Sequence, residues 1–161
     1  ENLQEVYLWL MGSLSGRTWN HLTMSAPYVL GGLLVALWLA KDLNVYLLGE
    51  EAAHSLGIDV QRVQRLVLMI GSLMAAACVS VSGVIGFVGL MVPHALRLVF
   101  GAEHRRLMFH SLWGGAVFLL TADTLARTLF SPIELPVGII TAFVGGPFFI
   151  YLLKRGSAGH G

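Results

Sequence analysis

The sequence predicts an all-α membrane protein with five transmembrane helices. Hydrophobic residues make up 56% of the 161 residues and charged residues only 12%, whereas soluble domains carry about 25% charged residues. The apolar residues gather in long runs without charge, each close to the ~20 residues that cross the hydrocarbon core of a bilayer. Glycine, proline and basic residues divide these runs and set the boundaries of the expected spans.

The first span is expected over residues 22–40, which contain no charged side chain and end at Lys41 and Asp42. Pro27 lies near the expected start, where a helix tolerates proline best. The preceding residues 1–21 are expected to form an extracytoplasmic or interfacial segment, or the end of a preceding span.

The second and third spans come from one long run, because residues 66–93 carry no charge. This run is too long for one span and too short for two ordinary spans with a loop. It therefore predicts a full helix over residues 65–81, a turn at Ser82-Gly83 and a shorter helix over residues 84–100.

The fourth span is expected over residues 107–129 and the fifth over residues 135–154. The connection between them is rich in turn-forming residues, and Pro136 suits the first turn of the last helix. Residues 22–155 thus form the expected membrane domain, and residues 156–161 are expected to be a disordered tail.

Basic residues orient the expected spans. If the connection between the first two spans is cytoplasmic, eight of the 10 Lys and Arg residues lie on that side and only Arg17 and Arg127 lie outside. Cytoplasmic loops carry an excess of Lys and Arg, so this orientation is favoured and puts the C-terminus in the cytoplasm. An acidic first residue outside, without an initiator methionine, favours a piece of a longer protein.

The longest polar connection covers residues 43–64. Its segment Glu50–Leu56 has a helical pattern, Gly57 is a C-cap signal, and Asp59 suits the N-cap of the next helix. The pattern by itself fits an ordinary amphipathic connector as well as a rigid lever outside the membrane.

A glycine repeat follows the second expected span. Gly83, Gly86 and Gly89 recur every third residue, so they fall near one helical face and permit a close helix crossing or an irregular bend. Pro93 leaves the carbonyl group of Gly89 without its usual partner. No second His, Cys or carboxylate lies at ligand spacing in the segment of His94, so we expect a structural histidine, no metal site and no cofactor.

Several function classes are disfavoured by the composition. A net charge of +1 gives no indication of nucleic-acid binding, and the single cysteine, Cys78, excludes a disulfide within the chain. The sequence contains no Gly-x-x-x-x-Gly-Lys-Ser/Thr phosphate loop. We therefore expect no catalytic residue, and ATP hydrolysis would have to come from a partner.

Four motifs resemble the FecCD/BtuC-like permeases of ABC importers for iron-siderophores, haem and cobalamin. They are Gly83–Arg97, Glu103–Arg106 (with glutamate where the family has aspartate), Ala122–Arg127 and Thr141–Phe149. They occur in the family's order and spacing, and the resemblance covers residues 7–155. It implies the C-terminal half of a ten-helix permease of the bacterial inner membrane, working with a second permease copy as a homodimer or as half of a fused pair.

The resemblance also implies partners and site residues. A separate ATPase subunit would contact the cytoplasmic loop at Gly49, Glu50, Glu51, Ala52, Ala53 and Gly57. A substrate-binding protein outside would dock on Arg127, with Asp123 orienting it, although the two residues also fit a purely structural ion pair. Helix packing is expected at Gly83, Gly86, Gly89, Pro93, Gly145 and Gly146.

Two other classes remain as alternatives. An intramembrane enzyme would use His94, His104 or Asp123, but the orientation separates Asp123 from both histidines by most of a membrane thickness. An ion-driven secondary transporter would need charges near the bilayer midplane, where the expected spans have almost none.

Overall fold

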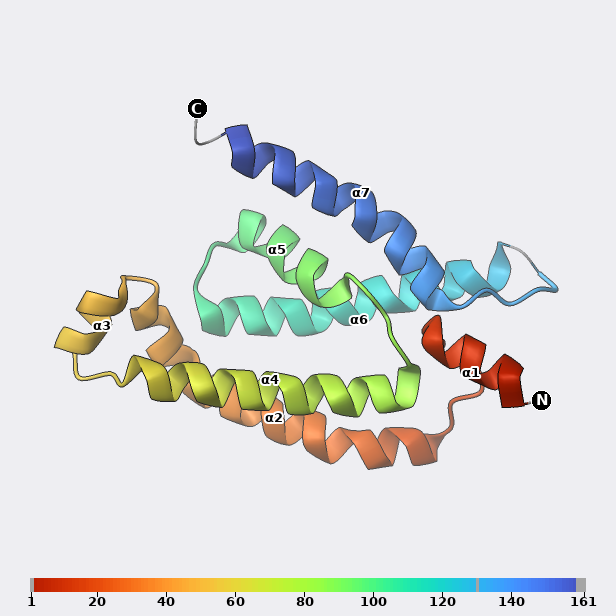
Figure 1. Ribbon diagram of the computed structural model, residues 1–161, viewed down its shortest axis with the longest axis horizontal. Coiled ribbons are helices and arrows are strands. Elements are labelled where there is room, and N and C mark those ends of the chain that lie inside the picture. The colour runs from red at the N-terminus through yellow and green to blue at the C-terminus, as the bar shows by residue number, and fades with distance from the viewer. Residues whose placement is uncertain (1, 130, 159–161) are drawn as a thin grey trace.

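The computed structural model describes residues 2–129 and 131–158, and these ranges contain helices and loops without a strand. The all-α prediction is therefore confirmed for the described residues (Figure 1). The helices are α1 (Asn2–Leu10), α2 (Trp19–Tyr46), α3 (Glu50–Ser55), α4 (Val60–Ser82), α5 (Val88–Phe100), α6 (His104–Thr128) and α7 (Val137–Ala158).

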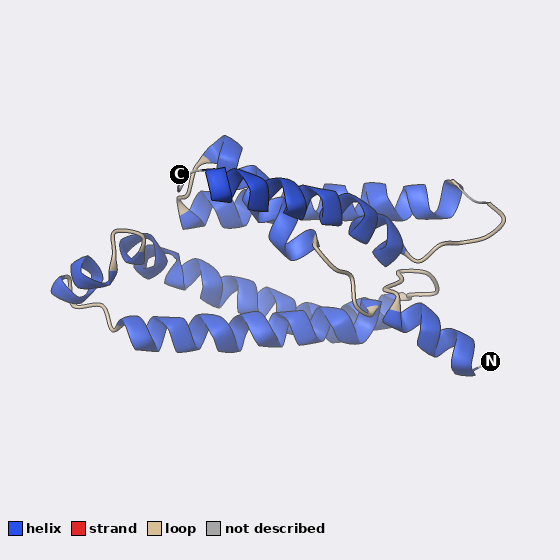
Figure 2. Ribbon diagram, turned by 45° about the horizontal axis from the view of Figure 1, so that its top comes forward, coloured by secondary structure: helices blue, strands red, loops and turns tan. Residues whose placement is uncertain are grey.

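The long helices form two groups that lie next to each other (Figure 2). α2 and α4 run antiparallel and pack against each other, and α3 lies in the connection between them. α6 packs against α5 and α7, and α5 also contacts α7. A contact between α2 and α6 joins the two groups.

Different helices and connections lie at the two ends of the helix bundle. α3, the turn between α5 and α6, and the last turns of α7 lie at one end, termed the α3 end (left in Figure 1). α1 and the connection between α6 and α7 lie at the other, termed the α1 end. The helix bounds assign to the α3 end the eight basic residues expected in the cytoplasm, which are Lys41, Arg62, Arg65, Arg97, Arg105, Arg106, Lys154 and Arg155.

Among the described residues, three helices are long and apolar enough to cross a membrane: α2, α4 and residues Val137–Arg155 of α7. α6 has 25 residues, which corresponds to about 38 Å of helix, but it carries charged residues in its first and last turns. α5 has only 13 residues, which is about 20 Å and short of the ~30 Å hydrocarbon core. The span expected over residues 84–100 is therefore a helix too short to cross a bilayer alone, although a shorter helix was expected here.

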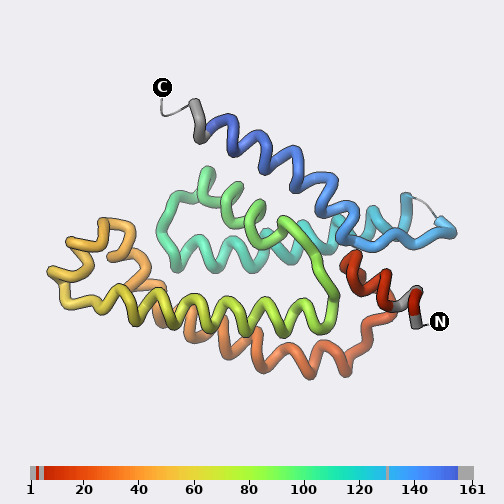
Figure 3. The backbone as a smooth tube through the Cα atoms, in the orientation of Figure 1, coloured from red at the N-terminus to blue at the C-terminus, as the bar shows by residue number. Residues whose placement is uncertain are grey.

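Several expected boundaries need correction. The helix expected over residues 84–100 begins only at Val88, because the chain from Gly83 to Phe87 is a non-helical connection (Figure 3). α2 begins three residues earlier and ends six residues later than the expected span 22–40, so Pro27 lies inside the helix and not near its start.

The chain ends agree with expectation only in part. Residues 2–10 form α1, within the segment 1–21 that was expected to be an interfacial helix or the end of a preceding span. The expected tail 156–161 is helical as far as Ala158 in α7, and residues 159–161 lie outside the described residues. The polar connection expected over residues 43–64 is shorter, because α2 and α4 extend into it from both sides.

Much of the apolar surface is exposed in this chain. None of the most apolar 18-residue window of α4 is buried, and only 11% of the corresponding window of α2 is buried. Leu39, Val137 and Thr141 are the largest side chains that are fully buried. Exposed apolar surface of this extent indicates contact with lipid or with other polypeptide.

Three segments cross at the α1 end through their backbones. The N–H of Ser13, after α1, donates to the carbonyl group of Ser82 at 2.9 Å. The N–H of Gly138, at the start of α7, donates to the carbonyl group of Gly12 at 3.0 Å. These bonds tie the loop after α1 to the end of α4 and to the start of α7.

Glycine is required at this crossing because the backbones approach too closely for a side chain. A Cβ atom on Gly83 would meet the carbonyl oxygen of Trp9, and one on Gly138 would meet that of Met11. Gly12 abuts the backbone after α4 in the same way. We refer to Gly12, Gly83 and Gly138 as the glycine junction.

Candidate functional site

α3 and its flanking residues form the first candidate surface, at the α3 end. Gly49 has φ 106° and Gly57 has φ 78°. Residues with a side chain rarely adopt such positive φ angles, whereas glycine does so readily. The two glycines let the chain turn sharply into and out of a helix of six residues. Asp59 then caps α4, since its side chain accepts the N–H of Arg62 at 3.0 Å, as the sequence predicted.

The exposed side of α3 combines acidic and apolar side chains. Glu50 and Glu51 lie exposed in its first turn, where the helix dipole favours negative charge. Ala53 is completely buried, and α3 packs against α2 and α4. Leu48 and Leu56, on either side of α3, are 71% and 65% exposed. Acidic and apolar surface at α3 is therefore left uncovered by the described part of the chain.

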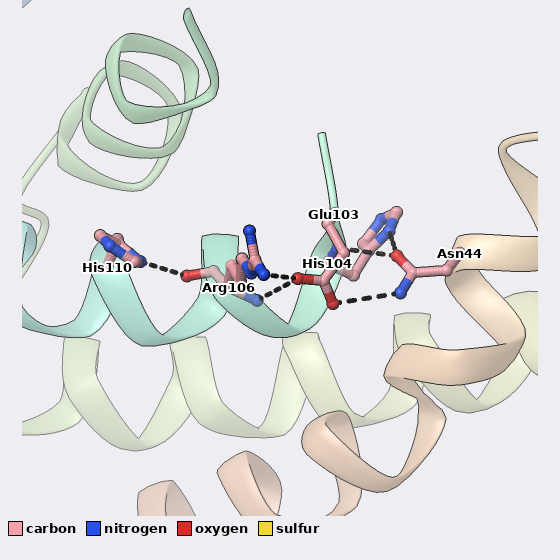
Figure 4. Close-up of polar contacts among 5 residues, drawn as sticks. All are labelled: Asn44, Glu103, His104, Arg106 and His110. Carbon is pink, nitrogen blue, oxygen red and sulfur yellow. Dashed lines mark hydrogen bonds and ion pairs between the residues drawn. The ribbon is translucent and has the colours of Figure 1, made fainter. Parts of the chain in front are cut away.

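A polar cluster joins α2 to the start of α6 at the same end (Figure 4). Glu103 caps α6, since its carboxylate accepts the N–H of Arg106 at 3.3 Å and lies 3.4 Å from the Arg106 side chain. The side chain of Asn44 reaches across from α2. Its Oδ1 accepts the backbone N–H of His104 at 2.7 Å, and its Nδ2 donates to Glu103 Oε1 at 3.4 Å.

The His104 imidazole lies on the same amide. Its Nδ1 is 3.0 Å from Asn44 Oδ1, so the tautomer that carries the proton on Nδ1 donates to that oxygen. His104 precedes the expected span 107–129. Burial, together with the Arg97 cation, lowers the pKa of His104 below its usual range, and the Glu103 carboxylate acts in the opposite direction.

The second candidate surface is the last turn of α6, at the α1 end. Arg127 Nε donates to Asp123 Oδ2 at 2.8 Å, and the two side chains are 39% and 19% exposed. The four-residue spacing puts both on one face of the helix. Asp123 thus holds the guanidinium in place and leaves part of it accessible, which is compatible with both docking and a structural ion pair.

The loops around this pair are also connected. Ser15, in the loop after α1, donates its hydroxyl to Glu134 Oε2 at 2.5 Å. Glu134 lies in the connection between α6 and α7, so this bond links two loops that border the last turn of α6. Sequence reasoning did not predict this contact, since 119 positions separate the two residues.

The residues expected in helix packing have different surroundings. Gly83 belongs to the glycine junction, and a Cβ on Gly145 would meet the side chain of Phe87. Apart from chain neighbours and the backbone of the same helix, no described atom lies within 4 Å of the Cβ position at Gly86, Gly89 or Gly146. Of the repeat Gly83, Gly86 and Gly89, only Gly89 lies within a helix, so the three glycines do not share a helical face. Pro93 lies inside α5.

The groups that an intramembrane enzyme would need do not converge. His104 and Asp123 are 19 positions apart on α6, which places them about 28 Å from each other. His94 lines a largely apolar groove of about 420 Å³ between α5 and α7. Within residues 2–129 and 131–158, no group of three or more His, Cys, Asp or Glu side chains is arranged to hold a metal ion.

Residues 1–155 match the FecCD transport family. The chain belongs to this family. It is 52% identical over 146 residues to the cobalamin import system permease protein BtuC of Halobacterium salinarum, covering 91% of this chain and 39% of that protein. It is 44% identical over 155 residues to the hemin transport system permease protein HmuU of Yersinia pestis, covering 96% of this chain and 46% of that protein.

A solved structure described as a metal-chelate type ABC transporter in an inward-facing conformation has the same fold. The TM-score is 0.87 at 35% sequence identity, covering 96% of this chain and 50% of that one. The FecCD chain described here thus spans two fifths to half of the length of the relatives above. The family resemblance and the permease fold predicted from the sequence are confirmed.

The site residues that the sequence did not reveal are those defined by distant contacts. Asn44 lies 60 positions before His104, and in the linear sequence it is one polar residue near the end of a long apolar helix. The sequence indicated close packing at Gly138 but not its partner Gly12, because the two glycines meet only in the folded chain. A polar residue just after a charge-free run was the one available signal for Asn44.

Proposed function

We propose that this FecCD chain is part of the permease of an ATP-driven importer for an iron-siderophore, haem or cobalamin. The observation that carries the proposal is α3, a short glycine-bounded helix with an exposed acidic pair that stands outside the long apolar helices. Family membership and the names of the relatives support the cargo class.

In this proposal the α3 end faces the cytoplasm. The gathering of basic residues at that end supports the orientation, which also makes the C-terminus cytoplasmic in a bacterial inner membrane. A separate ATP-binding cassette subunit then contacts Gly49 to Gly57, with Glu50 and Glu51 as the charged contacts and the exposed Leu48 and Leu56 beside them. ATP hydrolysis takes place in that subunit.

The α1 end then faces the substrate-binding protein. Arg127 is the proposed docking residue, and Asp123 orients it through the 2.8 Å ion pair. A partly exposed guanidinium held in one direction suits a charge-assisted contact with a carboxylate of the partner. The exposed apolar faces of α2 and α4 meet lipid, the rest of the permease or the second permease copy.

Reconstitution of the whole transporter tests this function. The full-length permease that contains this chain, its ATPase and its binding protein are placed in liposomes, and uptake of cobalamin, haem and a ferric siderophore is measured with and without ATP. We expect ATP-dependent uptake of one of these cargoes. Uptake of none of them, or uptake that persists without the ATPase subunit, would contradict the proposal.

A further inference from the structure

We propose that Asn44 is a positioning residue that transmits movement of α3 to α6. The inference rests on the proposed function, because it assigns the route by which the ATPase contact at one end affects the docking surface at the other. It concerns a residue that lies in neither surface and that makes its contacts through one side-chain amide.

Both ends of the Asn44 amide bond to the start of α6. Its oxygen accepts from the backbone N–H and from Nδ1 of His104, at 2.7 and 3.0 Å. Its nitrogen donates to the Glu103 carboxylate at 3.4 Å. Because the acceptor and the donor face different groups, only an amide in this orientation satisfies both (Figure 4).

No other hydrogen bond between described helices joins the two helix groups, although α2 also packs against α6. Among the described helices, the hydrogen bonds that join α2, α3 and α4 to α5, α6 and α7 are those of Asn44. The other side-chain bond near α3, from Gln64 Nε2 to the Tyr46 hydroxyl at 3.2 Å, joins α2 to α4 within one group. Polar transfer of a displacement between the groups at this end therefore depends on Asn44.

Asn44 joins α2 to α6, and these two helices connect the proposed ATPase contact to the proposed docking surface. Asn44 is in the last turn of α2, which leads directly into the segment of α3. Its partner helix α6 runs from this contact to the Asp123–Arg127 pair in its last turn, about 28 Å away. A displacement of α3 that moves the end of α2 thus acts on the helix that carries the proposed docking residue.

The first variant is Asn44→Asp in the full-length permease, assembled with its ATPase and binding protein in nanodiscs. The new side chain keeps an oxygen for His104 but puts a second oxygen against the Glu103 carboxylate, so it replaces attraction by repulsion. We expect basal ATPase activity within about twofold of wild type and a roughly tenfold smaller stimulation by the binding protein, as typical allosteric couplings are of this size.

The rescue variant adds Glu103→Gln to Asn44→Asp. The new amide at position 103 can donate to the new carboxylate at position 44, and its oxygen can still accept the N–H of Arg106. The polarity of the bond is then reversed and the bond is restored. We expect the stimulation to return to within about twofold of wild type, which a general loss of stability would not explain.

Tyr46→Phe is the matched control. It removes the hydroxyl that accepts from Gln64, at the same end and one turn or less from Asn44, but it leaves the contact between the two groups intact. We expect basal and stimulated ATPase activity as in wild type. Asn44→Ala removes the amide without adding charge, and we expect a loss like that of Asn44→Asp which Glu103→Gln does not rescue.

The outcomes separate this inference from the proposed function. If the wild-type transporter imports cargo and Asn44→Asp is stimulated normally, or if Glu103→Gln does not rescue it, the inference is wrong and the function stands. Failure of both Asn44 variants to assemble would assign a structural role and also overturn the inference. A wild-type assembly without ATP-dependent uptake would overturn the proposed function itself.

Discussion

The α1 end and the α3 end of this chain are held together by different parts of the polypeptide. At the α1 end, backbone groups of three segments bond to one another, and glycines allow them to approach. At the α3 end, one asparagine side chain joins the two helix groups and a short helix lies between two glycines with positive φ. Separating the buried backbones at the α1 end would break several hydrogen bonds at once. At the α3 end, a movement between the helix groups has to break only the hydrogen bonds of one side chain.

This difference separates a fixed end from a movable one. In the proposed importer the α1 end has to present a constant surface to the binding protein, and the α3 end has to follow the ATPase. Packed regions change between discrete arrangements more readily than they deform. We therefore expect changes at the glycine junction to affect folding, and changes at the α3 end to affect coupling.

The largest effect is expected from Gly138→Ala in the glycine junction. The added Cβ would meet the carbonyl group of Met11, and backbone atoms cannot move aside as a flexible side chain can. Overpacking of this kind costs about 1–3 kcal/mol. We expect a midpoint of thermal unfolding about 2–6 °C lower, measured on the detergent-solubilised full-length permease.

Gly146→Ala on the same helix is the matched control for that variant. No described atom outside its own helix backbone and chain neighbours lies within 4 Å of its Cβ position. Alanine favours a helix over glycine by roughly 0.5–1 kcal/mol. We expect an unchanged or higher unfolding midpoint. Equal destabilisation by both variants would show that the close backbone approach at Gly138 does not limit stability. The contrast between the two ends would then be wrong.

The junction also shows what the sequence could and could not predict. Local signals were sufficient for the end of α4 at Ser82, the end of α5 at Phe100 and the cap of α4 by Asp59. The start of α5 was missed because Phe87 adopts a left-handed conformation with φ 67°, and Gly145 provides the space for its side chain. That space comes from a helix far along the chain.

The candidate site divides in the same way. Residues that act through their local helix were recognisable, such as the α3 segment between Gly49 and Gly57 and the Asp123–Arg127 pair. Their roles in the ATPase contact and in docking stay predictions. Asn44 could not be found, because its partners are set by the packing of α2 against α6 and by no spacing within one element.

The second prediction concerns charge reversal on α3. Glu50→Lys combined with Glu51→Lys changes two exposed side chains in the first turn, where the helix dipole disfavours positive charge by about 0.3–1 kcal/mol for each residue. We expect the permease to insert normally and transport to fall by about tenfold or more, because a misplaced like charge across an interface is costly. Liposome uptake and copurification of the ATPase measure the two effects.

A matched control for charge reversal lies close to the same segment. Gln61→Lys adds a positive charge at an exposed position in the first turn of α4, outside the proposed contact. We expect transport close to wild type. If assembly, ATPase coupling and transport all remained normal in the Glu50 and Glu51 variant, the assignment of α3 as the ATPase contact would be wrong.

The smallest effect is expected from Arg127→Glu at the docking surface. The change places a carboxylate four residues from Asp123, where like charges on one helix face repel by a few tenths of a kcal/mol, so the permease should still fold. Exposed charges at the edge of an interface mainly change the association rate and its salt dependence. We expect capture of the binding protein to slow by about threefold to tenfold at low salt, with assembly of the ATPase unchanged.

Surface-immobilised transporter and binding protein in solution, at low and at physiological ionic strength, measure this effect. The difference from wild type should shrink as salt is added, because screening over about 8–10 Å removes the electrostatic steering.

Thr128→Lys is a useful comparison, since it adds positive charge to the neighbouring exposed position and should not slow capture. A compensating glutamate-to-arginine change on the binding protein should restore part of the rate. If Arg127→Glu folds correctly and captures the partner at the wild-type rate at low salt, the Asp123–Arg127 pair is a structural ion pair, and the α1 end receives the partner through other residues.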